Sequence, residues 1–368
     1  MVHLRIVAPH DIAEHTLDLL CQAKSVYNVI HLPDAASKPR GDVILCDVAR
    51  EDASVILGDL RELDIPAKGS IAIEDIDSEI SDVSKEAERA APGMPSDAVV
   101  WEEVEQRTSE NTELSASFLL FMVLAMLIAA VGVLEDSPVL IIGAMVVGPE
   151  FGPLAGLCVA IVQRQKEMAK RSLSAIAVGF PVGILATFLI TLAYRATEIG
   201  PDEYPHENTL TAFISNPDYF SFWVAFLAGT AGVLSLTNAK SGALIGVLIS
   251  VTTIPAAANV AVAAAYGEWG ESKGAALQLG VNLTSIIGAG VLTLFIQRRY
   301  YLNRRIKHLQ DPAREAAGLP IGRSARATSG AQKVLDHRAA GGGHFHLPHR
   351  HKSDGAPKER DSAPKDGA

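Results

Sequence analysis

The sequence predicts a polytopic α-helical membrane protein with a small α+β domain at its N-terminus. Two patterns predict this fold class: residues 115–297 contain six long apolar segments, and residues 1–76 alternate short strand and helix patterns. A mean hydropathy of +0.21 also points away from a purely soluble protein.

The charges divide the chain into three parts. Residues 1–114 hold 10 basic and 24 acidic side chains, residues 115–297 hold 7 and 11, and residues 298–368 hold 15 and 7. An acidic head therefore precedes a membrane body and a basic tail, and the composition of the tail, residues 298–368, predicts that it is largely disordered and cytoplasmic. Basic residues beside membrane spans face the cytoplasm and anionic lipid, so the tail favours a lipid surface as its partner, and no nucleic acid.

The head, residues 1–76, shows period-two alternation for four strands and helical spacing for two helices. In chain order these are strand 2–7, helix 12–23, strands 26–32 and 42–48, helix 53–63 and strand 70–73. The order βαββαβ predicts a ferredoxin-like domain, with two helices on one face of an antiparallel sheet. Ligand sensing, assembly and solubility all remain open as its role.

Residues 77–114 predict an acidic helical linker. Pro92, Gly93 and Pro95 divide it into two short helices. In the second helix, Trp101 and Val104 form a small apolar stripe, but the opposite face is acidic and would be repelled by anionic lipid. We therefore expect a plain connecting helix here.

Six apolar segments in residues 115–297 are each long enough to cross a bilayer. They are residues 115–134, 137–163, 172–194, 219–239, 241–267 and 274–297. The N-terminus lacks the continuous apolar stretch of a cleavable signal peptide, so the first span is expected to direct insertion. Basic connections alternate with acidic ones, which predicts a multi-pass protein of the inner membrane with both termini in the cytoplasm.

The second span is interrupted at its centre. Gly148, Pro149, Gly152 and Pro153 disfavour helix, because proline lacks a backbone donor and glycine lacks a steric preference. Irregular backbone at membrane depth is tolerated only where it faces protein or a wet cavity. Glu150 lies inside this interruption, and an ionisable residue at such depth normally faces a cavity, a partner or a pathway. A wet vestibule without a transport role is the alternative.

The six spans predict an internal repeat of three spans, residues 115–196 and 219–297. Three motifs recur: the segment 132–134 as 232–234, the segment 140–143 as 243–246, and Pro153 as Pro255 with a slip of one position. Gly179 similarly has a counterpart in Gly280. An odd number of spans per repeat places the copies in opposite orientations, which predicts a 3+3 inverted repeat with broken helices 2 and 5.

The fifth span supplies the matching candidate residues. Thr252 and Thr253 precede Pro255, Asn259 follows one turn later, and Asn282 lies in the sixth span. Their hydroxyl and amide groups are candidate ligands for an ion or small solute. A buried asparagine also joins helices to one another, and that alternative stays open.

The run SPVLIIGAMVVGPEFGPLAGL, residues 137–157, together with the later three-span copy, resembles the domain of unknown function 389 family of prokaryotic membrane proteins. The resemblance covers about residues 115–297. It implies membrane placement and carries no biochemical activity.

The leading hypothesis is a homo-oligomeric transporter or channel, a dimer or trimer, in which Glu150 handles a proton or cation and the head gates or senses. A membrane-anchored sensor or scaffold without transport is the alternative. The span interiors lack a catalytic set, so no enzyme, cofactor or metal centre is expected. Cys21, Cys46 and Cys158 are too scattered for a disulfide framework. The histidine tract at 344–351 indicates a solvated tail or a weak metal-binding segment.

Overall fold

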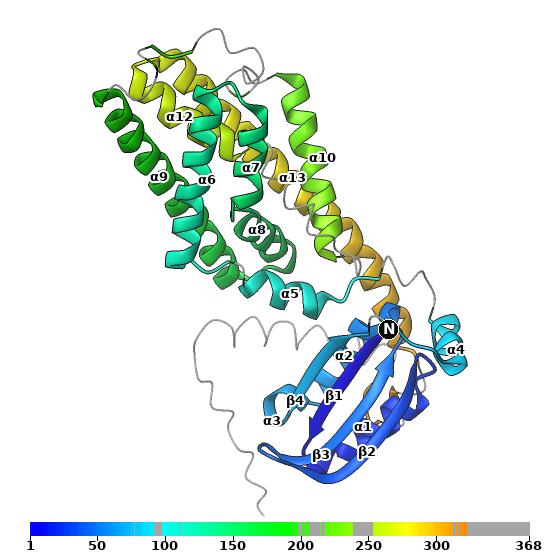
Figure 1. Ribbon diagram of the computed structural model, residues 1–368. Helices are drawn as coiled ribbons and strands as arrows, with labels where there is room; N and C mark the ends of the chain where they lie inside the picture. The colour runs from blue at the N-terminus through cyan, green and yellow to red at the C-terminus, as the bar shows by residue number, and fades with distance from the viewer. Residues whose placement is uncertain are drawn as a thin grey trace, which may run out of the picture.

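The computed structural model consists of a helical bundle joined to a small sheet-containing head (Figure 1). It describes residues 1–76, 78–91, 98–110, 112–197, 201, 203–205, 214, 218–237, 253–311, 314–315 and 317–321. Thr252 and the histidine tract of the tail lie outside these residues.

The head contains a four-stranded antiparallel sheet whose strand order is β2-β3-β1-β4. Its elements are β1 (Val2–Ala8), α1 (His10–Gln22), β2 (Val26–Ser37), β3 (Arg40–Val48), α2 (Arg50–Glu62), α3 (Ile65–Lys68) and β4 (Ser70–Asp75). All four predicted strands and both predicted helices are present. The strand β2 extends five residues beyond the predicted end, and the one-turn helix α3 was not predicted.

Period-two alternation buries one face of the head sheet, as expected for a sheet covered on one side. Val2, Leu4 and Ile6 of β1 are fully buried. They pack in one cluster with Leu20 of α1 and Ile56 of α2, among others. The core of the head thus lies between the sheet and these two helices.

Two helices, α4 (Asp82–Ala90) and α5 (Trp101–Glu110), follow the head. In Figure 1, α5 lies between the head and the bundle. Trp101 and Val104 of α5 are buried in one cluster with Val159 of α8 and Leu294 of α13. The apolar stripe of α5 therefore packs against the bundle, a contact that was not predicted for this connecting helix.

The bundle contains seven described helices. They are α6 (Ala116–Leu134), α7 (Pro138–Val147), α8 (Phe151–Gln163), α9 (Lys166–Ala196), α10 (Tyr219–Thr237), α12 (Ile254–Tyr266) and α13 (Trp269–His308). Four of them, α6, α9, α10 and α13, are long and apolar enough to cross a membrane, and the bent pair α7 and α8 makes a fifth candidate span. Only the second half of the predicted fifth span, as α12, falls within the described residues.

Large apolar side chains cover much of the outer surface of the bundle. Leu185 and Leu189 of α9 are more than half exposed, and so is Phe220 of α10. Apolar surface on this scale needs an apolar solvent or a partner. The bundle is therefore compatible with association with a lipid bilayer.

Three pairs of bundle helices begin at a constant separation along the sequence. Glu150 and Thr253 are 103 positions apart, and the same separation relates the first residues of α6 and α10, of α8 and α12, and of α9 and α13. The helices α6 and α10 each have 19 residues, and α8 and α12 each have 13.

The helix α13 has 40 residues and runs from the bundle to the head (Figure 1). The composition of residues 298–368 predicts a largely disordered tail, but residues 298–308 belong to α13. Beyond this helix, Ala317 and Leu319 are buried in the core of the head. For the described residues 298–311, 314–315 and 317–321, the prediction of disorder is therefore wrong, because basic side chains in this segment bind acidic groups of the head.

Candidate functional site

The candidate site lies where the second span is broken. The helix α7 ends at Val147 and α8 begins at Phe151, with a bend of 55° between them. Pro149 has no backbone donor, so a continuous helix would lose a hydrogen bond there. Pro153 lies in the first turn of α8, where its missing N–H costs nothing because the first four N–H groups of a helix have no partner within it. The break therefore covers only residues 148–150.

Glu150 is the N-cap residue of α8, and its side chain is buried. Thr253, the N-cap residue of α12, is also buried and donates from Oγ1 to Glu150 Oε1 at 2.9 Å. The site thus brings together the N-termini of α8 and α12, whose N-cap residues are 103 positions apart in the sequence. Helix N-termini carry partial positive charge and favour a nearby carboxylate.

The Glu150 side chain packs directly against the backbone of Gly148. A Cβ at position 148 would collide with Glu150 Oε2 and would lie 2.9 Å from Ile254 Cγ1. Any larger residue at this position would therefore force Glu150 and Ile254 to shift. Gly148 and Pro149 are half-buried beside Glu150, and Gly152 is half-buried in the first turn of α8.

The wall next to the site is apolar. Ala144 of α7 packs with Ile254, Ala257 and Ala258 of α12 and with Met122 of α6. An isolated carboxylate is costly in such surroundings, so Glu150 is stable as a neutral acid, or as an anion compensated by hydrogen-bond donors, helix N-termini or a cation. The arrangement is chemically suited to exchanging a proton or a cation.

The two predicted asparagines, Asn259 and Asn282, make their described side-chain hydrogen bonds with residues other than Glu150. Asn259 is buried, about 9 Å along α12 from Thr253 at 1.5 Å per residue, and its Oδ1 accepts a hydrogen bond from the Tyr204 hydroxyl at 3.0 Å. Asn282 is buried on α13, and its Oδ1 accepts from Gln278 Nε2 at 3.2 Å. The structure thus brings together Glu150, Thr253 and the residues of the break, but its described contacts link neither asparagine to Glu150.

The hydrogen-bond partners of the two asparagines, Tyr204 and Gln278, were not predicted from the sequence. Gln278 lies inside the sixth predicted span, so its uncommon polarity there was a usable signal. Tyr204 lies in the connection after the third span, and nothing in its local sequence indicates that it reaches Asn259.

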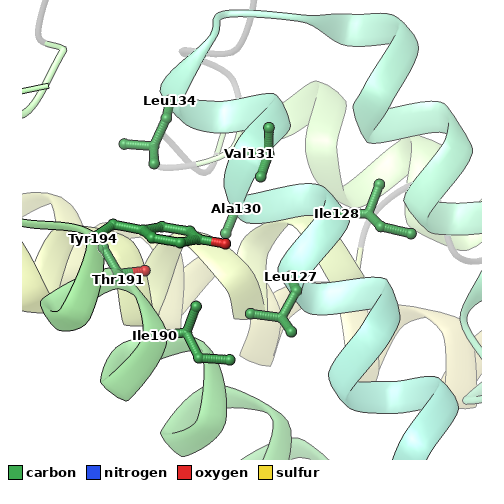
Figure 2. Close-up of a pocket in the computed structure, with 8 residues that line it drawn as sticks. All are labelled: Leu127, Ile128, Ala130, Val131, Leu134, Ile190, Thr191 and Tyr194. Atoms are coloured by element: carbon green, nitrogen blue, oxygen red, sulfur yellow. The ribbon is translucent and has the colours of Figure 1, made fainter. Parts of the chain in front are cut away.

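A small cavity of about 170 Å³ lies between α6 and α9, apart from Glu150. Figure 2 shows the Tyr194 ring extending across this space. The lining is mainly apolar and comprises Leu127, Ile128, Ala130, Val131, Leu134, Ile190, Thr191 and Tyr194. None of these described lining residues is charged, so the cavity does not extend the candidate site.

An ionic cluster joins the end of α13 to α2 of the head. Asp59 is fully buried and contacts Arg305 at 2.5 Å, His308 at 2.7 Å and Arg314. Glu62 contacts the same two arginines, at 2.8 and 2.6 Å. Burial alone would raise the pKa of Asp59, but the hydrogen bond from His308 and the charges of the two arginines outweigh it and hold the pKa below its usual range.

A polar cleft of about 550 Å³ lies where α2, α5 and the start of α9 meet. Its lining residues are Arg61, Glu102, Glu105, Gln106, Ser109, Glu110, Gln165, Glu167, Met168 and Arg171. The head and the bundle therefore meet around charged groups as well as around the buried α5 stripe.

The comparisons with known proteins support the family resemblance. Residues 145–288 match the family described as Domain of unknown function (DUF389). This match contains the break, Glu150, Thr253 and both asparagines. The chain is also 23% identical over 236 residues to the "Uncharacterized protein MJ0678" of Methanocaldococcus jannaschii, covering 64% of this chain and 70% of that protein. No solved structure matches the chain.

Proposed function

We propose that this protein is a membrane transporter or channel for an ion or small solute, with its site at the broken helices. One observation carries the proposal. A buried carboxylate, Glu150, lies at the junction of two helix N-termini and accepts a hydrogen bond from Thr253, the N-cap of the second. Discontinuous helices whose N-termini meet near the bilayer centre are a common way to build transport sites.

The proposed architecture has six spans arranged as a 3+3 inverted repeat. The constant separation of 103 positions between corresponding helices supports a repeat. An odd number of spans per repeat would then give the halves opposite orientations, with both termini in the cytoplasm by the distribution of basic connections.

The chemistry of the site favours a proton or a cation as the transported species. Glu150 supplies the charge and Thr253 a neutral oxygen, both in apolar surroundings. Carboxylate and hydroxyl oxygens suit hard cations, and a carboxylic acid can also carry a proton. An anion would meet repulsion from an ionised Glu150.

We propose a ferredoxin-like fold for the head and a role in regulating the bundle. The element order and the strand order β2-β3-β1-β4 support the fold. The continuous helix α13 and the packing of α5 give the head two mechanical connections to the bundle. A change in the head would therefore reach the helices that contact the site.

The test is flux through proteoliposomes, screened with protons, monovalent cations and small anions. Wild type is compared with Glu150→Gln, which preserves shape and removes the ionisable group. Glu135→Gln is the matched control, because Glu135 is an exposed carboxylate at the end of α6. Light scattering first establishes that all three proteins form the same oligomer.

The proposal predicts flux of a cation or proton that Glu150→Gln abolishes and Glu135→Gln leaves intact. Flux that is unchanged in Glu150→Gln would remove Glu150 from the pathway. If none of the three folded proteins moves any tested ion, the transport proposal fails. The alternative of a membrane-anchored sensor or scaffold would then be pursued through ligands of the head.

A further inference from the structure

A group of metal-ligating side chains lies at one end of the head sheet, remote in sequence from the membrane site. His10 is the first residue of α1, two positions after the end of β1, and Asp42 lies on β3 opposite Ala8 of β1. Asp34 lies on β2. The ligand atoms of these three side chains all lie within 4.8 Å of one another.

The local backbone explains why these residues meet. The pairing of β2 with β3 is irregular between Leu32 and Ala36, and Asp34 lies within this irregularity with a left-handed backbone, φ 51°. A bulge changes the direction in which a strand presents its side chains. The Asp34 backbone N–H also donates to Asp42 Oδ1 at 3.1 Å, which ties the irregular segment to β3.

The Asp42 carboxylate is held at both oxygens. Its side chain is only 3% exposed. Oδ1 faces His10 Nδ1 at 3.3 Å, and Oδ2 contacts His31 Nε2 at 2.7 Å. His31 thereby orients the carboxylate through the oxygen that faces away from His10. Metal-binding carboxylates typically have such a hydrogen-bonded partner outside the ligand set.

We propose that His10, Asp34 and Asp42 bind a divalent first-row transition-metal ion, with His31 positioning Asp42. Two ligands that each lie about 2.1 Å from a metal are separated by roughly 3.0–3.5 Å in octahedral or tetrahedral geometry. The 3.3 Å between His10 and Asp42 already meets this. His10 and Asp34 are exposed, so rotation of their side chains can close the remaining distance.

The ligand types set the class of ion. One imidazole and two carboxylates suit Zn²⁺ and its first-row neighbours, whereas Mg²⁺ and Ca²⁺ prefer oxygen ligands alone. The exposed position leaves coordination sites for water. A bound ion would fasten the beginning of α1 to the irregular segment of β2.

A neighbouring pair on the same sheet provides a matched control. His3 Nδ1 contacts Asp47 Oδ1 at 2.6 Å, which resembles the contact between His10 and Asp42. The second oxygen of Asp47 accepts from the Asn28 amide at 2.7 Å, however, and an amide N–H is not a metal ligand. His3 lacks the third ligand, so its removal is not expected to affect metal binding.

The test measures Zn²⁺ and Mg²⁺ binding to the full chain by competition with a fluorescent chelator. Every sample carries alanine at His344, His346, His349 and His351, so that the tail does not contribute. We expect one Zn²⁺ per chain, bound at least 100-fold more tightly than Mg²⁺. His10→Ala and Asp34→Asn should each weaken Zn²⁺ binding at least tenfold, and His3→Ala should change it less than twofold.

Because His10 and Asp34 are exposed, these variants are expected to fold, which circular dichroism checks. Zn²⁺ binding that is equal in wild type and His10→Ala would overturn the proposal. So would an equal loss of affinity in His3→Ala, or Zn²⁺ binding no tighter than that of Mg²⁺. The measurement involves no transport, so its result is independent of the proposed function.

Discussion

Replacing Asp59 by asparagine should detach the end of α13 from the head. The fully buried Asp59 carboxylate contacts Arg305, His308 and Arg314. Removing one partner of a buried ion pair typically costs about 3–5 kcal/mol, because the other charge stays buried without compensation. Glu62 still contacts both arginines, so we expect the lower end, about 3 kcal/mol. That is roughly a hundredfold shift toward the detached state, at about 1.4 kcal/mol per tenfold.

Limited trypsin digestion measures this shift. When opening is fast relative to cleavage, the cleavage rate follows the population of the open form. Asp59→Asn should therefore raise the initial rate of cleavage within residues 298–311 roughly a hundredfold. Mass spectrometry identifies the cleavage sites. Asp18→Asn is the matched control, since Asp18 is exposed on α1. A less than threefold rise in Asp59→Asn would refute the assigned role of the cluster.

The same contact predicts a pH dependence. The pKa of Asp59 is lower in the folded protein than its ordinary value of 3.8. Its stabilising contribution is therefore fully present above that ordinary value and is lost as the pH falls through the folded pKa. The thermal stability difference between wild type and Asp59→Asn should persist from neutral pH to about pH 5 and be lost only in stronger acid. A difference that already disappears near pH 6 would contradict this assignment.

Two further predictions concern the membrane site. Gly148→Ala introduces a Cβ that collides with Glu150 and crowds Ile254, so it should destabilise the protein by about 1–3 kcal/mol. The control is Gly143→Ala, whose Cβ meets nothing within 4 Å. Equal melting temperatures of the two variants in detergent would contradict the close fit around Gly148. Thr253→Val removes the donor to Glu150 and should cost about 1–3 kcal/mol, whereas Thr253→Ser keeps the hydroxyl and should behave as wild type in the same melting assay.

Local patterns were sufficient to predict most of the head and the break in the second span. Alternation places Val2, Leu4 and Ile6 on one face whatever the rest of the chain does. Pro149 likewise ends a helix through its own covalent structure. Thr253 was predicted as a candidate ligand from the repeat, and the structure adds its hydrogen bond to Glu150.

Contacts between distant segments were not predictable from one sequence. The charged residues after 297 have the composition of a juxtamembrane tail, and nothing local indicates that Arg305 meets Asp59, 246 positions away.

The predicted repeat was aligned with unequal separations. The motif at 132–134 was matched at a separation of 100 positions and Gly179 at 101, whereas the helices begin 103 apart. Small apolar residues recur too often in spans for short matches to establish a register.

The packing of Ala317 and Leu319 into the core of the head has a consequence for biosynthesis. The head leaves the ribosome before the bundle helices, yet it cannot complete its core until residue 319 has been made. Until then, Asp59 lacks the arginines that compensate its charge. The head should therefore reach its final stability only after the bundle helices have been synthesised, so that a chain arrested before residue 305 would present an incomplete head to the proteases of the cell.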